Sequence, residues 1–215
     1  MKGGVRGGTR PARVSPSDLE PNSMAGLIHY TNAMSRGIRT QAILDVFEID
    51  HERVDVDFRN GQTRTQEYLQ IHPYGRVPAL KHGDTTVVES GAITLYLCDL
   101  YPERLNVPDP ATADRALLYE WLFFFQTSLE PVAIKAMSQK ADKKKILGET
   151  LVLLKSMASR FKGPYVLGSE FSVLDVIVHV ELAWYRLMGI FPEGLEPYHS
   201  FLERTSDRMN LNSEV

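Results

Sequence analysis

The pattern of hydrophobic and polar residues predicts short strands and helices in the first half of the chain. Within residues 51–58 (HERVDVDF), valine and phenylalanine alternate with aspartate, which is typical of a half-buried strand. Other short apolar runs end in turn residues and also indicate strands. Between and after them, apolar residues recur at helical spacing. The expected strands are 26–30, 51–58, 77–81 and 85–88, and the expected helices follow Ser35 or occupy 67–71 and 90–100.

The order of these elements defines an α/β unit. Its first two strands are joined through a helix, which implies parallel strands and a right-handed crossover. Its last two strands are separated only by His82-Gly83-Asp84, a short turn that favours an antiparallel hairpin. Parallel and antiparallel pairs within one unit predict a mixed four-stranded sheet.

Beyond residue 111 the strand pattern stops, and helical spacing alone continues. The aromatic cluster at 119–125 falls in this part, and its nearly consecutive rings cannot all face one core. Some of these rings are therefore expected at the cleft between the domains or at a dimer interface. The expected helices of this second half are 111–137, 143–161 and 172–187.

These patterns predict an α/β domain followed by an all-α domain. The first domain is expected at 24–102 and the helical domain at 111–215. The stretch between them, 103–110, is rich in proline and is an expected linker. Residues 1–23 are rich in Gly, Arg, Pro and Ser without periodicity, so we expect a disordered leader and regard Met24 as the more natural start.

Composition narrows the classes of function. The net charge of −3 favours neither nucleic acid nor an anionic membrane, and no apolar run approaches the roughly 20 residues of a membrane helix. The single cysteine, Cys98, excludes an intrachain disulfide and a CxxC redox pair. The histidines are scattered without helical ligand spacing, so no metal site is expected. A cytoplasmic protein without nucleic-acid or membrane partners fits these features best.

Pro78 stands at the head of a predicted strand, although proline lacks the N–H that a sheet ladder needs. The peptide bond before a proline adopts the cis form more readily than other peptide bonds. A cis bond here would turn the N–H and C=O of Val77 outward, where a ligand with a peptide unit could pair with both. The local sequence fits a plain edge-strand proline equally well.

The pair Glu89-Ser90 ends the fourth predicted strand and begins the next helix. A helix N-terminus offers unpaired N–H groups and partial positive charge to a carboxylate, and Glu89 can accept hydrogen bonds from an ammonium group. Together with the Ser90 hydroxyl, these groups would form a receptor for a zwitterion. The alternative is a simple helix cap, with Glu89 stabilising the helix dipole.

Residues 30–39 (YTNAMSRGIR) join the first strand to the first helix, at the sheet edge where α/β folds place ligands. A hydroxyl donor or a helix N-terminus beside a thiol stabilises the thiolate and so lowers the pKa of that thiol. The alternative interpretation is a structural turn in which Ser35 is the N-cap.

The stretches GRVPAL and VVESGAI, with the α/β then all-α order, resemble a cytosolic glutathione transferase. The resemblance covers roughly residues 26–205, nearly everything but the leader. It implies a thioredoxin-like first domain, and glutathione as the co-substrate. It also implies that Pro78 follows a cis bond and that the Val77 backbone pairs with the cysteinyl unit of glutathione.

The same resemblance assigns the two charged ends of the tripeptide. Glu89 and Ser90 would bind the γ-glutamyl end, and Arg76 would lie beside the ligand. Arg64 falls where the family often places a basic contact for the glycine carboxylate.

The family activates the thiol near the first strand–helix junction with Tyr, Ser, Cys or, in some bacterial classes, Asn or Thr. Cys98 lies in the third helix and is interpreted as a buried small hydrophobe. Tyr30 ends the first strand at the position of the tyrosine of the alpha, mu, pi and sigma classes. The motifs resemble bacterial theta-like and nu-like members more, so Ser35 is the favoured residue, with Asn32 and Tyr30 as alternates.

The resemblance implies a transferase that conjugates glutathione to small hydrophobic electrophiles, a detoxification chemistry. One alternative is a glutathione-dependent disulfide reductase, which also needs no protein cysteine. Another is a non-catalytic interaction module of the same fold. The expected partners are glutathione, an electrophile bound between the domains, and a second copy in a homodimer.

The sequence Ser172-x-x-Asp175 opens an apolar helix in the second half. This spacing is that of a capping box, in which the acid accepts a hydrogen bond from the N-cap residue. Asp175 is therefore predicted to stabilise the fold and not to take part in thiol chemistry.

Overall fold

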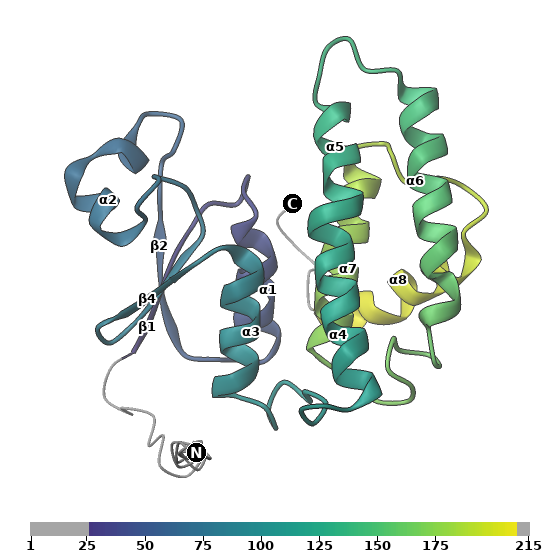
Figure 1. The fold of residues 1–215 in the computed structure, drawn as a ribbon, viewed down its shortest axis with the longest axis horizontal. Helices are drawn as coiled ribbons and strands as arrows, with labels where there is room; N and C mark the ends of the chain where they lie inside the picture. The colour runs from purple at the N-terminus through teal and green to yellow at the C-terminus, as the bar shows by residue number, and fades with distance from the viewer. Residues whose placement is uncertain (1–25, 210–215) are drawn as a thin grey trace, which may run out of the picture.

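The computed structural model describes residues 26–209 and contains a four-stranded sheet in the order β2-β1-β3-β4 (Figure 1). β1 lies parallel to β2 and antiparallel to β3, and β3 forms an antiparallel hairpin with β4. The predicted mixed sheet is thereby confirmed, whereas the predicted leader at 1–23 lies outside the described residues. The strands are β1 (Leu27–Thr31), β2 (His51–Asp55), β3 (Ala79–His82) and β4 (Thr85–Val88).

Two strands are shorter than the sequence pattern predicts. β2 ends at Asp55, because the Asp57 carboxylate accepts the backbone N–H groups of Arg59 and Asn60 and folds the chain into a turn. β3 begins at Ala79, since Pro78 has no N–H to offer the ladder.

The helices of the first half lie on both faces of the sheet. α1 and α3 pack between the sheet and the second half, and α2 lies on the opposite side (Figure 1). His29 of β1 is buried beneath α1, with Nδ1 2.9 Å from Oε1 of Gln41 and Nε2 2.7 Å from Oγ1 of Thr40. These helical segments are α1 (Gly37–Val46), the 3-10 turn η2 (Gln62–Arg64), α2 (Gln66–Ile71) and α3 (Ser90–Leu100).

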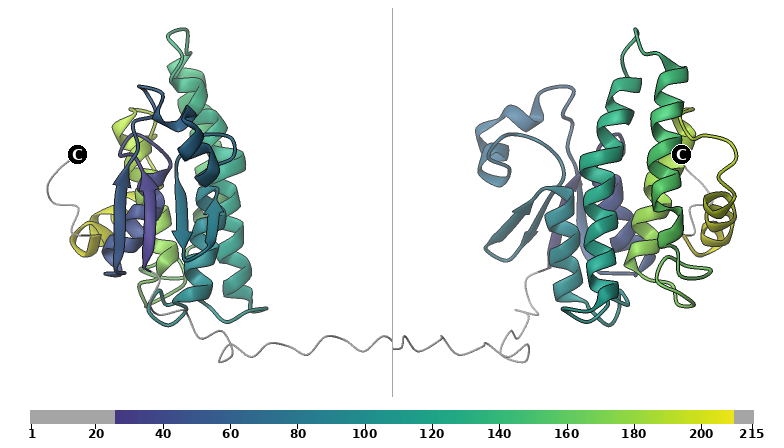
Figure 2. Two further views of the ribbon diagram at one scale, coloured as in Figure 1. Left: turned by 90° about the vertical axis from the view of Figure 1, so that its left-hand side faces the viewer. Right: turned by 45° about the vertical axis from the view of Figure 1, so that its right-hand side comes forward.

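The second half is helical throughout the described residues, as predicted. From the sheet side, the strands lie in front of these helices (Figure 2). Tyr198 and Phe201 of its last helix are buried in the core. The elements are α4 (Ala113–Phe123), the π-helix η3 (Phe124–Leu129), α5 (Glu130–Ala136), α6 (Lys143–Met157), η4 (Ala158–Arg160), α7 (Val173–Leu187) and α8 (Glu196–Met209).

The expected continuous helix at 111–137 is wrong in one detail, because six of its residues form the π-helix η3. Pro131 follows directly, in the first turn of α5. Proline cannot donate to the carbonyl four residues earlier, here that of Thr127, so the regular helical ladder is interrupted at this point. α8 had not been predicted at all, although its buried positions recur at helical spacing.

α7 forms the centre of the helical half and is buried along most of its length. Its N-terminus has the predicted capping box: Asp175 accepts the Ser172 N–H at 2.8 Å and the Ser172 hydroxyl at 2.9 Å. The same carboxylate also accepts the N–H of Val166 at 2.8 Å. α7 packs directly against α1, so the helical half is anchored to the helix that begins beside the sheet edge.

The aromatic cluster at 119–125, which spans the end of α4 and the start of η3, divides between core and surface. Trp121 and Phe125 are buried in the core, whereas Tyr119 and Phe123 are exposed. Cys98 of α3 is fully buried, and burial raises the pKa of its thiol to about 12. Within residues 26–209, no helix combines the length and the apolar character that a bilayer crossing requires.

Candidate functional site

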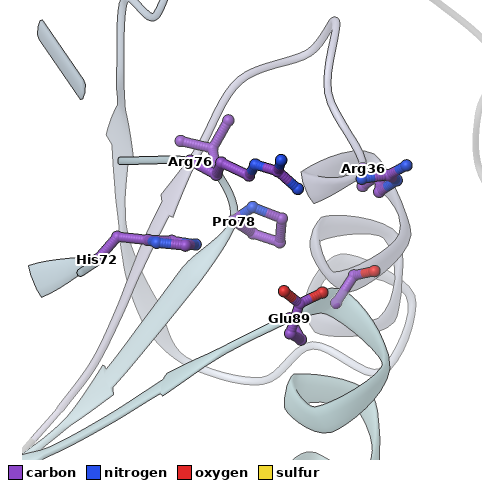
Figure 3. Close-up of a pocket in the computed structure, with 7 residues that line it drawn as sticks. Arg36, His72, Arg76, Pro78 and Glu89 are labelled. Atoms are coloured by element: carbon purple, nitrogen blue, oxygen red, sulfur yellow. The ribbon is translucent and has the colours of Figure 1, made fainter. Parts of the chain in front are cut away.

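A pocket opens at the edge of the sheet where three connections meet (Figure 3). The α2–β3 connection, the β4–α3 junction and the β1–α1 connection each contribute to its wall. Its cavity volume is only about 20 Å³, far below that of typical drug-sized pockets. It can therefore hold part of an extended ligand while the remainder lies along the open surface. The lining residues are Arg36, His72, Arg76, Val77, Pro78, Glu89 and Ser90.

The Val77–Pro78 peptide bond is cis and lies immediately before β3. No backbone–backbone hydrogen bond of Val77 occurs among residues 26–209, so its N–H and C=O are available at the pocket wall. The neighbouring Arg76 carbonyl accepts the Tyr68 hydroxyl at 2.7 Å, which fixes the connection against α2. Burial raises the pKa of Tyr68 to about 12, so the phenol stays protonated and can donate this bond.

Glu89 and Ser90 form the opposite wall, where β4 turns into α3. Glu89 has a positive φ of 71°, a conformation uncommon for a residue with a side chain, and it directs the chain sharply into the helix. Its Oε1 accepts the Tyr74 hydroxyl at 2.5 Å. Ser90 is the first residue of α3, so the helix presents the N–H groups of its first turn to this wall.

The second half contacts this corner through Gln126 of the π-helix. Its Nε2 lies 3.4 Å from the Ser90 hydroxyl oxygen. A side chain at Gly91 would place its Cβ only 2.5 Å from the same nitrogen, so glycine is what permits the close approach. The helical half therefore packs directly onto the N-terminus of α3.

His72 is a pocket residue that the sequence did not single out. Its ring is 2% exposed, and its Nδ1 has no hydrogen-bond partner within residues 26–209. Burial lowers the pKa of His72, so the ring is neutral near pH 7 and can offer a donor or an acceptor to a ligand. The ring also packs edge-on against Tyr74, with centroids 4.5 Å apart.

Arg36 reaches the pocket from the β1–α1 connection, although the sequence signal favoured its neighbour Ser35. Its Nε forms an ion pair with Glu130, the first residue of α5. The other oxygen of Glu130 lies 3.4 Å from Nη2 of Arg39, which is also paired with Glu181 of α7. Arg39, Glu130 and Glu181 are each at most 5% exposed, so a buried chain of alternating charges joins α1 to the helical half.

The three candidate thiol-activating residues lie close to the pocket but do not line it. Tyr30 packs edge-on against Tyr68. Asn32 donates to the Val56 carbonyl at 3.1 Å and accepts the Met34 N–H at 3.0 Å. The Ser35 hydroxyl donates to the Asn32 carbonyl at 2.7 Å and accepts the Gly37 N–H at 3.0 Å.

Arg64 also lies outside the pocket lining. Its Nη1 donates to the Tyr74 carbonyl at 3.2 Å and so supports the loop between α2 and β3. The structure thus brings together Val77, Pro78, Glu89 and Ser90 with Arg76, and it adds Arg36 and His72. No cluster of His, Cys, Asp or Glu suited to a metal ion occurs within the described part of the chain.

Comparisons with known proteins agree with this fold and pocket. Residues 25–99 match the family described as glutathione S-transferase, N-terminal domain. Glutathione S-transferase PARB of Nicotiana tabacum is 32% identical over 130 residues, covering 59% of this chain and 60% of that protein. Glutathione S-transferase 2 of Schizosaccharomyces pombe is 28% identical over 174 residues, covering 70% of each chain. The chain thus spans about 60% to 70% of the length of these relatives.

Solved structures extend the likeness over nearly the whole described fold. A glutathione transferase from Methylococcus capsulatus has a TM-score of 0.73 at 26% identity, covering 86% of this chain and 97% of that one. A glutathione transferase homologue from Sulfitobacter with bound glutathione has a TM-score of 0.71 at 22% identity, covering 85% and 93%, and it shows the fold alone. A thioredoxin-like domain followed by helices is therefore the class of protein that the fold defines. Together, the matches make this chain similar to glutathione transferases, and the family model itself covers residues 25–99.

Proposed function

We propose that the protein is a glutathione transferase and that the pocket of Figure 3 binds the tripeptide. One observation carries the proposal: the unpaired backbone of Val77 faces the same pocket as the Glu89 carboxylate and the N-terminus of α3. An unpaired backbone edge suits a peptide unit, and the carboxylate with the helix N-terminus suits a zwitterionic end. Glutathione combines both features in one small molecule.

In the proposed complex, each part of glutathione meets a group of matching chemistry. The cysteinyl N–H and C=O pair with the backbone of Val77 beside Pro78. The γ-glutamyl carboxylate accepts from the Ser90 hydroxyl and the first N–H groups of α3, and its ammonium donates to Glu89. The glycine carboxylate lies toward Arg76, with Arg64 as the second basic contact.

The proposed reaction starts with loss of the thiol proton to solvent at the N-terminus of α1. The sulfur electron pair then forms a bond to an electrophilic carbon, and the leaving group departs with the electrons of its own bond. Ser35 is the hydroxyl proposed to support the thiolate, with Asn32 and Tyr30 as alternates. The exposed side chains of Met34 and Phe123 support a hydrophobic surface for the electrophile beside the site.

Further features of the proposal follow from the family resemblance. They are a theta-like or nu-like subtype, a cytoplasmic location, a homodimer and a role in detoxification. The competing functions, disulfide reduction and a non-catalytic interaction module, are decided by the same assays.

The proposal is tested by calorimetric titration with glutathione, followed by turnover assays with 1-chloro-2,4-dinitrobenzene and with a glutathione mixed disulfide. We expect binding and aryl conjugation. Glu89→Gln should weaken glutathione binding about 10- to 100-fold, because it removes a charge-assisted hydrogen bond to the ammonium. Glu52→Gln, which removes an exposed carboxylate on β2, is the matched control and should bind normally.

Each other outcome points to a different function. Turnover of the mixed disulfide alone would favour the reductase. Binding without turnover of either substrate would favour the interaction module. Wild-type protein that binds no glutathione would overturn the proposal.

A further inference from the structure

We propose that His72 is a specificity-determining residue whose imidazole accepts a hydrogen bond from the α-ammonium of glutathione. This inference rests on the proposed function, because it assigns a role within the same pocket. It names the part of the ligand that the pocket selects, which is a γ-glutamyl end with a free ammonium group. A peptide that lacks this ammonium would then bind more weakly than glutathione.

The ring of His72 is buried and lacks a partner. It is 2% exposed, and its Nδ1 has no hydrogen-bond partner within residues 26–209. Figure 3 shows the ring directed into the pocket, between Arg76 and Glu89. Buried polar side-chain atoms nearly always have a partner, and leaving one without a partner costs free energy. A ligand group that supplies the missing partner would recover this free energy.

The backbone holds this ring in a fixed place. His72 is the C-cap of α2, and its N–H donates to the Tyr68 carbonyl at 2.9 Å. Its own carbonyl accepts the Gly75 N–H at 2.8 Å. Gly75 has a positive φ of 60°, and a Cβ there would lie 2.4 Å from the Thr63 carbonyl oxygen, so the tight turn requires glycine. The imidazole is therefore positioned before a ligand arrives.

The enclosed part of the pocket has room for one small group. Its cavity volume of about 20 Å³ is enough for a single water-sized group. An ammonium group has nearly the size of a water molecule, whereas a carboxylate with its two oxygens is larger. The enclosed space beside His72 therefore fits an ammonium group, and the carboxylate of the same γ-glutamyl end can lie at the N-terminus of α3.

The supply of acceptors in the pocket also favours His72 as a partner. An ammonium donates up to three hydrogen bonds, so one carboxylate oxygen does not satisfy it. Oε1 of Glu89 already accepts the Tyr74 hydroxyl at 2.5 Å. The two arginines of the lining can only donate, and the Ser90 hydroxyl is assigned to the ligand carboxylate. The imidazole is therefore the side chain of the lining that can add a second acceptor beside Glu89.

The protonation state of the ring suits this role. Burial lowers the pKa of His72 below its ordinary value of 6.5, the Glu89 carboxylate opposes this shift, and Arg76 adds to it. Near pH 7 the ring is neutral, so one nitrogen carries a lone pair and no positive charge repels the ammonium. A buried N–H without an acceptor is rarer in proteins than a buried acceptor without a donor, so the lone pair is assigned to the unpartnered Nδ1.

The test compares glutathione with glutaryl-cysteinylglycine, an analogue that has hydrogen in place of the α-ammonium and keeps both carboxylates. Calorimetric titration measures both dissociation constants for the wild type and for His72→Phe, which keeps an aromatic ring against Tyr74. We expect the substitution to weaken glutathione binding about 10-fold, because a hydrogen bond from a charged donor is lost, and to change the affinity for the analogue by less than about threefold.

Two further variants separate the acceptor from the shape of the ring. In His72→Asn, the side-chain oxygen takes nearly the position of Nδ1 and can accept the same hydrogen bond. Its affinity for glutathione should therefore lie within about threefold of the wild-type value. His199→Phe replaces a histidine of α8 outside the pocket lining, and it should leave both affinities unchanged.

The outcomes distinguish this inference from the proposed function. If the wild type binds no glutathione, the proposed function fails. If it binds glutathione and His72→Phe binds it equally well, the role of His72 fails alone. Equal weakening of glutathione and of the analogue would also overturn that role, because a purely structural function of the ring predicts this result.

A measurement on the wild type keeps the question decidable if His72→Phe does not fold. The nitrogen NMR signal of His72 Nδ1 should move when glutathione is added, because the lone pair becomes engaged, and it should keep its position with glutaryl-cysteinylglycine. The same response to both ligands would overturn the role of His72.

Discussion

Asp175 is predicted to stabilise the helical half, and Asp175→Ala measures how much. The substitution removes the acceptor of three hydrogen bonds, from the N–H groups of Val166 and Ser172 and from the Ser172 hydroxyl. The hydroxyl can rotate toward another acceptor, but the two N–H groups belong to residues at most 1% exposed. Each buried donor left without a partner costs about 1–3 kcal/mol.

One effect acts in the opposite direction. Burial raises the pKa of Asp175, which means that holding the ionised carboxylate in the core has a cost that alanine relieves. The two unpaired N–H groups together would cost about 2–6 kcal/mol, and relief of the buried charge reduces this. We therefore expect a net destabilisation of about 2–4 kcal/mol. For a protein of this size, the unfolding midpoint should fall by roughly 5–12 °C.

Thermal and urea unfolding of Asp175→Ala give the measurement, and Asp142→Ala is its matched control. Asp142 is also an aspartate at a helix start, where its carboxylate accepts the Lys145 N–H at 3.1 Å, but it is exposed. Losing this exposed cap should cost about 1 kcal/mol or less. An unchanged midpoint for Asp175→Ala, or a loss no larger than that of the control, would refute the reasoning. A changed thiol pKa of bound glutathione in the folded variant would refute its purely structural role.

Two further predictions concern buried charges and pH. Arg39→Met should destabilise the protein by about 3–5 kcal/mol, because it leaves the buried carboxylate of Glu181 without its charged partner. The double variant Arg39→Met/Glu181→Leu should recover much of that loss in urea unfolding, and a loss equal to the sum of the single variants would contradict the pairing. Burial lowers the folded-state pKa of His29 to about 4, below its ordinary value of 6.5, so protonation favours the unfolded state. Stability is full above pH 6.5 and should fall by about 2 kcal/mol per such histidine by pH 5. His29→Asn should remove the part of the pH dependence that is due to His29. The part due to His179, whose pKa burial also lowers to about 4, should remain. If the dependence of unfolding free energy on pH were the same in the variant, the prediction would be wrong.

Local sequence rules were sufficient for the sheet and for two walls of the pocket. The hairpin of β3 and β4 follows from a short turn between apolar runs, and the crossover through α1 follows from chain order. Glu89-Ser90 could be recognised because a strand-to-helix junction is visible in the hydrophobic pattern. Val77 could be recognised because the proline after it is out of place in a strand.

The features that were missed depend on contacts between distant parts of the chain. Arg36 meets Glu130 across 94 positions of sequence, and no local pattern reports such a pair. His72 becomes notable only when its burial is known, since a histidine in a loop is usually exposed. α8 is amphipathic but carries polar residues over much of its length, so its pattern was weaker than that of the apolar α7.

The charge chain from Arg36 through Glu130 and Arg39 to Glu181 has a consequence for how such proteins can be recombined. Two of its members belong to the part of the chain that contains the pocket, and two belong to the helical half. A chimera that joins this first half to the helices of a relative would contain Arg36 and Arg39 without the carboxylates that pair with them. Such a hybrid should fold poorly unless it has acidic residues at the positions of Glu130 and Glu181. The two halves can therefore be exchanged between relatives only together, or with these acidic residues retained.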